Sequence, residues 1–358
     1  MYYTSSEEDW AEISIGSNNE YLTNATFYYV VNIADAEIVL SDTALTYTGE
    51  AQVPSVTVTY GEETLTEGTD YELSYEEEAI DAGTYEITVS GTGSYTGSAT
   101  LSYTIEPKSI AGAEVTLSKT SYTYSGSANK PTVKSITLDG VTLTAGTDYS
   151  TTLKYSNNTS AGTGTVKVTG TGNYTGTASA TFTIKKKSYS SGTVTLSYTS
   201  TTYSGSARKP TVKSVKVTLN GSTKTLTKNT DYTVSYKNNK AIGKASVVIT
   251  LKGNYSGTIT KTFTIKPKKV TISSAKSSAK KKITVKWKKS SGSVKYQIAY
   301  KKKGGSWKYK TVSSTTYKKT LTGLTSGKYY YVKVRAYKKV SGKTYYGSWS
   351  STKKVKVK

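Results

Sequence analysis

The sequence of 358 residues contains no Cys and no His. Their absence excludes a disulfide framework, thiolate or imidazole metal ligands, a Cys nucleophile and a His general base. Ser and Thr are abundant, but only a Lys or a carboxylate is left to activate them as nucleophiles. The sequence therefore predicts a protein that is not an enzyme and that needs no cofactor.

Long apolar runs and a basic leader are also missing. No stretch of 18 or more apolar residues occurs, so the sequence predicts no membrane span. The first residues, Met1 to Trp10, are acidic and polar, whereas a signal peptide begins with a basic segment followed by an apolar one. Either the protein is cytosolic or this chain lacks its export signal.

Positive charge is missing from the N-terminal part of the chain. Residues 1–106 contain 20 Asp and Glu and no Lys or Arg, whereas residues 107–358 hold all 48 basic residues and only four acids. Residues 267–358 alone carry 27 basic residues and no acid. This segregation favours a polyanionic partner or electrostatic self-association, and it says nothing about the fold.

We predict that the purified protein associates head to tail at low salt, because a net charge of −20 in residues 1–106 can meet +27 in residues 267–358 of a second copy. At an ionic strength near 0.15 M the screening length is about 8 Å, so only close contacts survive there. Sedimentation velocity at low and high salt measures the effect. A chain that stays monomeric at about 20 mM salt rules the association out.

Three copies of one unit follow each other with a period near 80 residues, at about 33–106, 107–185 and 186–266. Each copy contains a Tyr-x-Gly signature, then Gly-Thr-Asp-Tyr, then Gly-x-Tyr-x-Gly. In the order of the copies, the Tyr-x-Gly signatures begin at Tyr47, Tyr124 and Tyr203. The Gly-Thr-Asp-Tyr signatures begin at Gly68, Gly146 and the variant Asn229. The Gly-x-Tyr-x-Gly signatures begin at Gly93, Gly172 and Gly253. Such a period is typical of whole small domains.

Within each copy apolar residues alternate with polar ones, as in Tyr85-Glu-Ile87-Thr-Val89. This period of two predicts half-buried antiparallel strands, and short strands separated by turn signals predict an all-β fold of β-sandwiches. Asn157-Asn158 and Asn238-Asn239 lie between such runs, where Asn tolerates the positive φ of a tight hairpin turn.

The three signatures together resemble the bacterial Ig-like repeats of long surface proteins. The resemblance implies tandem Ig-like sandwiches in an elongated array. The first copy departs from the pattern, because it has Glu76-Glu77-Glu78 where the other copies carry the Asn pair.

Residues 267–358 follow a different pattern. Ile283-Thr-Val285-Lys-Trp287 alternates with a large aromatic residue on the inner face, and Tyr330 begins a second alternating run. This segment resembles a fibronectin type III domain. The resemblance implies that Trp287 is the core aromatic of strand B and that Tyr330 occupies the tyrosine-corner position before strand F.

Residues 1–32 match neither module. Ser5-Ser-Glu-Glu8 is a capping box that predicts a short helix carrying Trp10 and Ile13. The segment from Ile15 to Tyr29 resembles the last repeat of the bacterial surface leucine-rich repeat family (BspA-like). One isolated repeat cannot bury its face. We therefore expect an N-terminally incomplete sequence from an extracellular protein, either on the cell surface or secreted.

The first copy contains an acidic cluster with several oxygen ligands, namely Asp70, Glu76, Glu77, Glu78 and Asp81. We interpret it as an acidic surface that keeps the domain soluble. A weak Ca²⁺ site is the alternative, although the spacing is not that of an EF-hand loop. A pair of catalytic carboxylates across a cleft is not expected on one small sandwich.

The recurring motifs have structural interpretations and one functional alternative. In Gly-Thr-Asp-Tyr, the Asp side chain can accept backbone N–H bonds in an Asx-type turn that begins a strand, while the Tyr anchors the strand. In Gly-x-Tyr-x-Gly, a tight turn folds its ring onto the sandwich. Exposed Tyr rings that stack on sugar are the alternative.

The basic C-terminal segment contains the candidate binding residues. If the fibronectin-like topology holds, strands C, F and G share a sheet, and one set of cations converges on its outer face: Lys295, Lys333, Arg335, Lys354 and Lys356. Neighbouring strands lie about 4.8 Å apart and residues on one face about 6.6 Å apart along a strand, so the face is densely charged. A merely solvated basic face is the alternative.

These observations favour a non-enzymatic part of a bacterial cell-surface or secreted protein. The Ig-like repeats are expected to act as spacers and the basic domain to hold an anionic cell-wall polymer. The alternative is an adhesin that recognises host glycan or protein. Specific binding of nucleic acid is not expected, because no groove-reading helix or recognisable motif is present.

Overall fold

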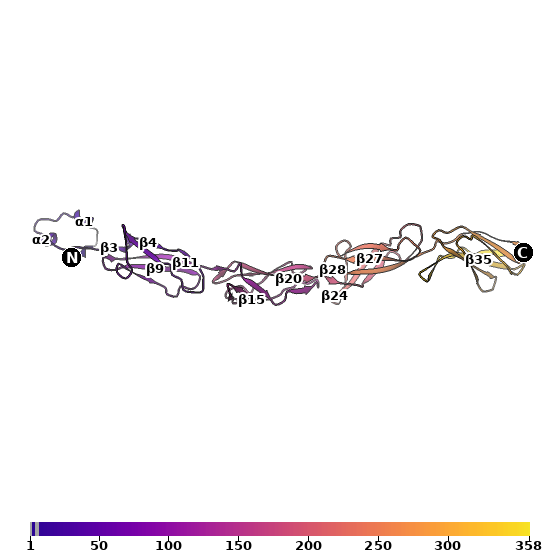
Figure 1. The fold of residues 1–358 in the computed structure, drawn as a ribbon, viewed down its shortest axis with the longest axis horizontal. Helices are drawn as coiled ribbons and strands as arrows, with labels where there is room; N and C mark the ends of the chain where they lie inside the picture. Colours follow the sequence, from indigo (N-terminus) through magenta and orange to yellow (C-terminus); the bar gives the residue numbers. More distant parts are fainter. Residues whose placement is uncertain (1, 4–6) are drawn as a thin grey trace. The chain divides into compact units, whose positions relative to one another are not determined.

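A computed structural model describes residues 2–3 and 7–358. Strands make up nearly all of its regular structure, as Figure 1 shows, and this confirms the all-β fold class. The helical elements are α1 (Glu7–Ala11), α2 (Glu20–Thr23) and the 3₁₀ turn Ile33–Asp35. Among the described residues no helix is both long and apolar enough to cross a membrane.

The chain divides into two compact units. The first comprises residues 1–121, 129–158 and 163–183, and therefore holds the first repeat and most of the second. The second comprises residues 122–128, 159–162 and 184–358, and holds the third repeat and the C-terminal domain. Two end loops of the second repeat, 122–128 and 159–162, thus group with the third repeat.

The first repeat is a sandwich of two sheets with the orders β4-β6-β7 and β5-β11-β9-β8. Its strands are β4 (Glu37–Leu40), β5 (Ala44–Thr46), β6 (Val56–Tyr60), β7 (Glu63–Thr64), β8 (Tyr71–Tyr75), β9 (Gly83–Gly91) and β11 (Ser98–Glu106). A short pair joins β3 (Val31–Asn32) to β10 (Tyr95–Thr96).

The second repeat has the same arrangement, with the sheets β13-β15-β16 and β14-β20-β18-β17 and the pair β12-β19. Its strands are β12 (Lys108–Ser109), β13 (Glu114–Leu117), β14 (Ser121–Thr123), β15 (Val133–Leu138), β16 (Val141–Thr142), β17 (Lys154–Ser156), β18 (Gly162–Thr169), β19 (Tyr174–Thr175) and β20 (Thr177–Lys185).

The third repeat again has the sheets β22-β24-β25 and β23-β29-β27-β26 and the pair β21-β28. Its strands are β21 (Lys187–Ser188), β22 (Thr193–Leu196), β23 (Ser200–Thr202), β24 (Val212–Leu219), β25 (Ser222–Thr225), β26 (Tyr232–Lys237), β27 (Gly243–Leu251), β28 (Tyr255–Ser256) and β29 (Thr258–Lys266). The recurring strand order shows that the sequence repeat is a structural one.

The alternation of apolar residues places one large ring at the same core position of each last strand. These rings belong to Tyr103, Phe182 and Phe263, and all three are buried. The predicted antiparallel pairing does not extend to all strands, because β5 pairs parallel with β11 and β23 parallel with β29, and the short pairs β3–β10, β12–β19 and β21–β28 are parallel too. The pairs β5–β11 and β23–β29 each join an early strand to the last strand of its repeat, and the rest of the repeat supplies the long crossover that parallel pairing requires.

The Gly-Thr-Asp-Tyr motif is structural, as the sequence predicts. The carboxylates of Asp70, Asp148 and Asp231 accept the backbone N–H of the residue four positions earlier, at 2.8, 2.7 and 2.8 Å. The Asp side chain therefore closes a loop with residues that precede it in the sequence, and it does not form an Asx turn with residues that follow it. Gly68 and Gly146 have φ values of 81° and 85°, and Asn229 has 67°, so the variant residue is one that tolerates the left-handed region.

The Asn pairs form longer turns than predicted. Asn157 and Asn238 have the expected positive φ, 51° and 55°. Five residues separate β17 from β18, however, so the connection is not a two-residue hairpin. The second Asn of each pair instead bonds to an earlier loop: the side-chain amide of Asn239 donates to the carbonyl of Arg208 at 3.0 Å.

The C-terminal domain is a sandwich of a three-stranded and a five-stranded sheet. The first has the order β30-β31-β34, and the second β33-β32-β35-β36 with β37 also paired to β35. The strands are β30 (Ile272–Ala279), β31 (Lys282–Trp287), β32 (Lys295–Lys302), β33 (Lys308–Val312), β34 (Lys318–Leu321), β35 (Tyr329–Val340), β36 (Lys343–Tyr346) and β37 (Lys353–Lys356).

The two aromatic residues singled out in this domain lie where the resemblance implies. Trp287 is 3% exposed in the core and packs against Tyr296 with 5.5 Å between ring centroids. The hydroxyl oxygen of Tyr330 accepts the backbone N–H of Thr325, five residues upstream, at 3.2 Å. This bond is the tyrosine-corner contact to the preceding backbone.

The N-terminal segment contains a parallel pair of short strands, β1 (Tyr2–Tyr3) with β2 (Tyr28–Tyr29). Ser5 and Ser6 of the capping box lie outside the described residues. Helix α1 contains Trp10, whose ring lies 4.1 Å from that of Phe27, but it ends at Ala11 and does not include Ile13. The leucine-rich repeat resemblance of this segment stays a prediction.

Candidate polyanion-binding face

The five predicted cations lie on strands β32, β35 and β37 of one sheet. Cross-strand register pairs Lys295 with Tyr337, and Lys354 with Tyr331. The residues that alternate with the cations, such as Val334 and Val355, are buried in the core. All five cations therefore project from the outer face of the five-stranded sheet.

The two central cations are enclosed by aromatic rings. The Lys333 ammonium lies 4.3 Å from the ring centroid of Trp307 and 4.8 Å from that of Trp349. The Arg335 guanidinium lies 4.3 Å from Trp349 and 3.7 Å from Tyr346. These five side chains alternate ring and cation, and we call them the aromatic–cation stack.

The aromatic–cation stack fixes its charges in place. Each contact of a cation with a ring contributes roughly 0.5–2 kcal/mol, and the Nε of Arg335 also donates to Oε1 of Gln297 at 2.8 Å. Burial lowers the pKa of the Arg335 guanidinium, which nevertheless remains protonated at neutral pH. Lys333 and Arg335 are half-buried, so they have less access to a ligand than the predicted charged plate requires.

Trp349 reaches the stack because residues 347–350 run beside β35. The N–H of Gly347 donates to the carbonyl of Ala336 at 2.9 Å, and the N–H of Ser350 donates to the carbonyl of Val334 at 2.8 Å. The hydroxyl of Ser350 accepts the N–H of Val334 at 2.9 Å. Since Ser350 is buried, the preceding Trp349 is directed to the outer face.

The remaining three predicted residues, Lys295, Lys354 and Lys356, are exposed, and we call them the free lysines. The Lys354 ammonium lies 4.3 Å from the ring centroid of Tyr329, which is itself exposed. The sequence has no Asp or Glu after Asp231, so the C-terminal domain offers these lysines no side-chain carboxylate.

The structure does not bring the acidic residues of the first repeat together. Asp70 closes the loop described above, and Asp81 accepts a hydrogen bond from the side chain of Asn173 at 2.7 Å. Glu76, Glu77 and Glu78 lie at the turn between β8 and β9. Within the described part of the chain no three acidic side chains gather as a metal site requires.

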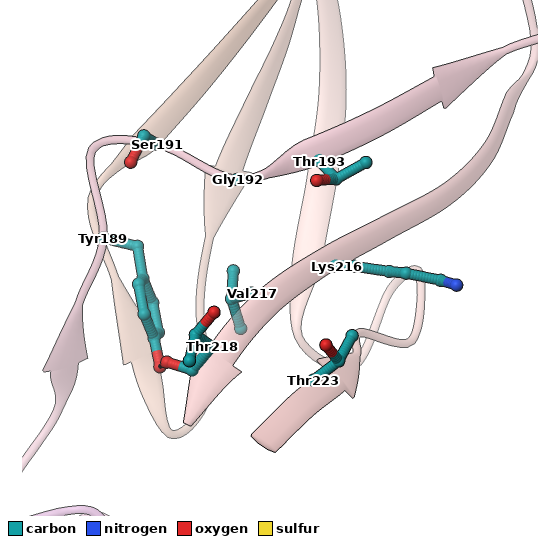
Figure 2. A pocket seen from close by; sticks show the side chains of 8 residues that line it. All are labelled: Tyr189, Ser191, Gly192, Thr193, Lys216, Val217, Thr218 and Thr223. Atoms are coloured by element: carbon teal, nitrogen blue, oxygen red, sulfur yellow. Dashed lines mark hydrogen bonds between the residues drawn. The ribbon is translucent and has the colours of Figure 1, made fainter. Parts of the chain in front are cut away.

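The third repeat has a surface pocket of about 340 Å³ that is shown in Figure 2. Its lining residues are Tyr189, Ser191, Gly192, Thr193, Lys216, Val217, Thr218 and Thr223. The Tyr189 hydroxyl donates to the carbonyl of Thr218 at 2.7 Å, while the Lys216 side chain extends away from that ring. No acid or second base faces the lysine among these lining residues, so the pocket offers no pair for acid–base chemistry.

Two residues that line this pocket differ from their counterparts in the first two repeats. Tyr189 takes the position that the fully buried Ile33 and Ile110 occupy in the first two repeats. Gly192 takes the position of Ala36 and Ala113. A Cβ at Gly192 would lie 2.8 Å from the carbonyl oxygen of Lys216, so the backbone here approaches β24 more closely than Ala permits.

Comparison with known proteins identifies two kinds of module. Residues 265–352 match the model of the fibronectin type III domain, and residues 36–109 and 113–188 match that of the MBG domain. A solved structure described as "Myokine structure" is 21% identical, with 26% of this chain and 95% of that chain covered and a TM-score of 0.21. No curated protein matches.

These matches confirm the predicted fibronectin type III domain and agree with the predicted Ig-like repeats, whereas they give no support to the leucine-rich repeat. Both kinds of module are typical of extracellular proteins, and both usually serve as structural or binding modules. The chain thus contains two segments that match the MBG domain model and, after the third repeat, one segment that matches the fibronectin type III model.

Proposed function

We propose that this chain is a non-enzymatic binding region of a bacterial cell-surface or secreted protein, whose fibronectin type III domain holds an anionic cell-wall polymer. The repeats act as spacers in this proposal. The observation that supports it best is the set of free lysines on one sheet face, in a segment with 27 basic residues and no acid.

The proposed mechanism is counterion release. Each phosphate or carboxylate of the polymer that meets a lysine frees condensed counterions, so the affinity falls steeply as salt rises. The sheet is already ordered, and the aromatic–cation stack holds the centre of the face rigid. Binding therefore costs little conformational entropy of the backbone. The free lysines make the contacts, while Lys333 and Arg335 mainly maintain the shape of the face.

A charge-matched pair of variants tests this proposal on the full chain. The first replaces Lys295, Lys354 and Lys356 by Gln. The control replaces Lys276, Lys286 and Lys318, which are exposed on the other sheet, by Gln. We expect the first variant to bind inorganic polyphosphate and polygalacturonate roughly tenfold more weakly at low salt and to lower the salt slope by about two to three. The control should change both values much less.

Three results contradict the proposal. Equal losses in the two variants indicate a merely solvated basic surface. Binding that persists at about 1 M salt excludes the electrostatic mechanism. Binding that maps to the first repeat, which has no basic residue, favours an adhesin that recognises its ligand through aromatic side chains.

A further inference from the structure

The Asn of the Gly-Asn-Tyr signature bonds to a different repeat from its own. In the first unit, Oδ1 of Asn173 accepts the backbone N–H of Ala82 at 2.8 Å, and its Nδ2 donates to Oδ1 of Asp81 at 2.7 Å. In the second unit, Oδ1 of Asn254 accepts the backbone N–H of Ala161 at 2.8 Å. These partners are more than 90 residues apart in sequence, and Ala82 and Ala161 occupy equivalent positions in successive repeats.

The Tyr of the same signature packs against the Tyr-x-Gly signature of the preceding repeat. The ring of Tyr174 lies edge-on to Tyr47 with 5.5 Å between centroids, and Tyr255 lies edge-on to Tyr124 at 5.4 Å. Tyr174 and Tyr255 are both buried. They are therefore not exposed platforms for sugar, and the rings fold against the neighbouring repeat as well as onto their own sandwich.

The first repeat supplies an internal comparison, because it has no repeat of this kind before it in the sequence. Ser94 stands there in the position of Asn173 and Asn254. Tyr95 is only half-buried, and its ring lies 6.2 Å from Tyr60 of the same repeat. The Asn and the full burial of the Tyr thus occur in the two copies that follow another repeat.

The third repeat meets a different domain at its far end, and its residues differ there. Ile242 takes the position of Ala82 and Ala161 and is buried in the core of the C-terminal domain, and the half-buried ring of Tyr203 packs against the same core. Gly292 lies against both, since a Cβ on it would be 2.7 Å from Ile242 and 3.1 Å from Tyr203. An apolar contact here replaces the hydrogen bond of the other two junctions.

We infer that the Gly-Asn-Tyr loop is a docking site for another repeat of this family, and that it recognises the Tyr-x-Gly turn and the Ala-Gly loop at the end of that repeat. The partner is defined by two features: a free backbone N–H at the Ala of the Ala-Gly loop and an aromatic ring edge from the Tyr-x-Gly turn. This assigns the two most conspicuous signatures a role in joining neighbours, which goes beyond the proposed polymer binding.

The same loop also holds the segment between repeats. The N–H of Lys187 donates to the carbonyl of Asn254 at 3.0 Å, and β21 pairs parallel with β28. The equivalent bond in the second repeat joins Lys108 to Asn173 at 2.9 Å. In each junction a single Asn, Asn173 or Asn254, therefore bonds both to the preceding repeat and to the short strand that connects the two repeats.

Amide hydrogen exchange of Ala82 and Ala161 in the full chain tests this inference. Each of these amides donates to an Asn side chain of the next repeat, so both should exchange slowly in the wild-type protein. Asn254→Ala should speed exchange at Ala161 roughly tenfold and leave Ala82 unchanged. Asn173→Ala should do the reverse, and Ser94→Ala should change neither.

A pair of Asp substitutions separates recognition from general destabilisation. Asn254→Asp keeps the acceptor oxygen. The second repeat has Ser160 in the position of Asp81, so no carboxylate opposes the new Asp at this position and protection of the Ala161 amide should remain. Asn173→Asp places a second carboxylate against Asp81, so protection of Ala82 should be lost because the like charges repel. Equal effects of the two substitutions contradict the inference.

Two measurements on the wild-type chain keep the test independent of whether the variants fold. If Ala82 and Ala161 exchange as fast as open-loop amides, the docking site does not exist. Protection should also be the same at low salt and at about 1 M salt, because the bonds of Asn173 and Asn254 described above involve no Lys or Arg side chain, whereas polymer binding should be lost at high salt. Loss of protection at high salt contradicts the inference without affecting the proposed function.

Discussion

Tyr255→Ala is expected to destabilise the third repeat by about 3–5 kcal/mol, the range seen when a large buried aromatic side chain is truncated to Ala. Tyr255 is 2% exposed and is among the largest fully buried side chains of the molecule. Its ring contacts Tyr124 and also lies 6.1 Å from Tyr189. Removal of the ring leaves a cavity that the rigid strands around it can close only in part.

Hydrogen exchange in strand β27 of the full chain is the appropriate measurement, because a chain of several domains has no single free energy of unfolding. Burial raises the pKa of the Tyr255 phenol, so the ring is neutral at the pH of the experiment. Tyr95→Ala, measured in strand β9, is the matched control. Tyr95 is half-buried and its ring lies against Tyr60 of its own repeat, so its loss should cost clearly less. Equal losses contradict the interpretation of Tyr255 as a junction residue.

Gly257→Ala is expected to have the largest effect of any substitution at the signature glycines. Gly257 has a φ of 103°, and a Cβ there would overlap the backbone carbonyl oxygen of Tyr189. The positive φ alone costs an L-residue about 1–2 kcal/mol. Backbone overlap adds to this cost, because β21 and β28 must separate to relieve it. We expect a loss of about 3 kcal/mol or more in the third repeat.

Gly176→Ala is the control for this prediction. Gly176 occupies the same position in the second repeat with a φ of 76°, but the nearest atom to its Cβ is the Ser109 hydroxyl oxygen at 3.0 Å, which can rotate away. The substitution should therefore cost only the penalty of the positive φ. The stability losses of the two variants are compared by thermal denaturation in which hydrogen exchange monitors the unfolding of each repeat. If they lose the same stability, the close approach of Tyr189 does not matter.

Several features of this protein followed from the sequence because they depend on neighbours along the chain. Alternation with a period of two specified which residues of each strand enter the core, and the buried Trp287, Tyr103 and Phe263 agree with it. The Asp of each Gly-Thr-Asp-Tyr motif bonds within four residues, so its structural role was predictable. The outer face of the C-terminal sheet followed from the same alternation together with the resemblance to a known domain.

Only the tertiary structure decided which side chains meet across strands and between repeats. Trp307 and Trp349 lie outside the strands, so periodicity could not place them beside Lys333. The sequence predicted a plate of five equal cations, whereas the structure shows an aromatic–cation stack and three free lysines. The partners of Asn173 and Asn254 are more than 90 residues away. A local pattern encodes the face on which a side chain lies, whereas strand register and domain packing determine what that side chain touches.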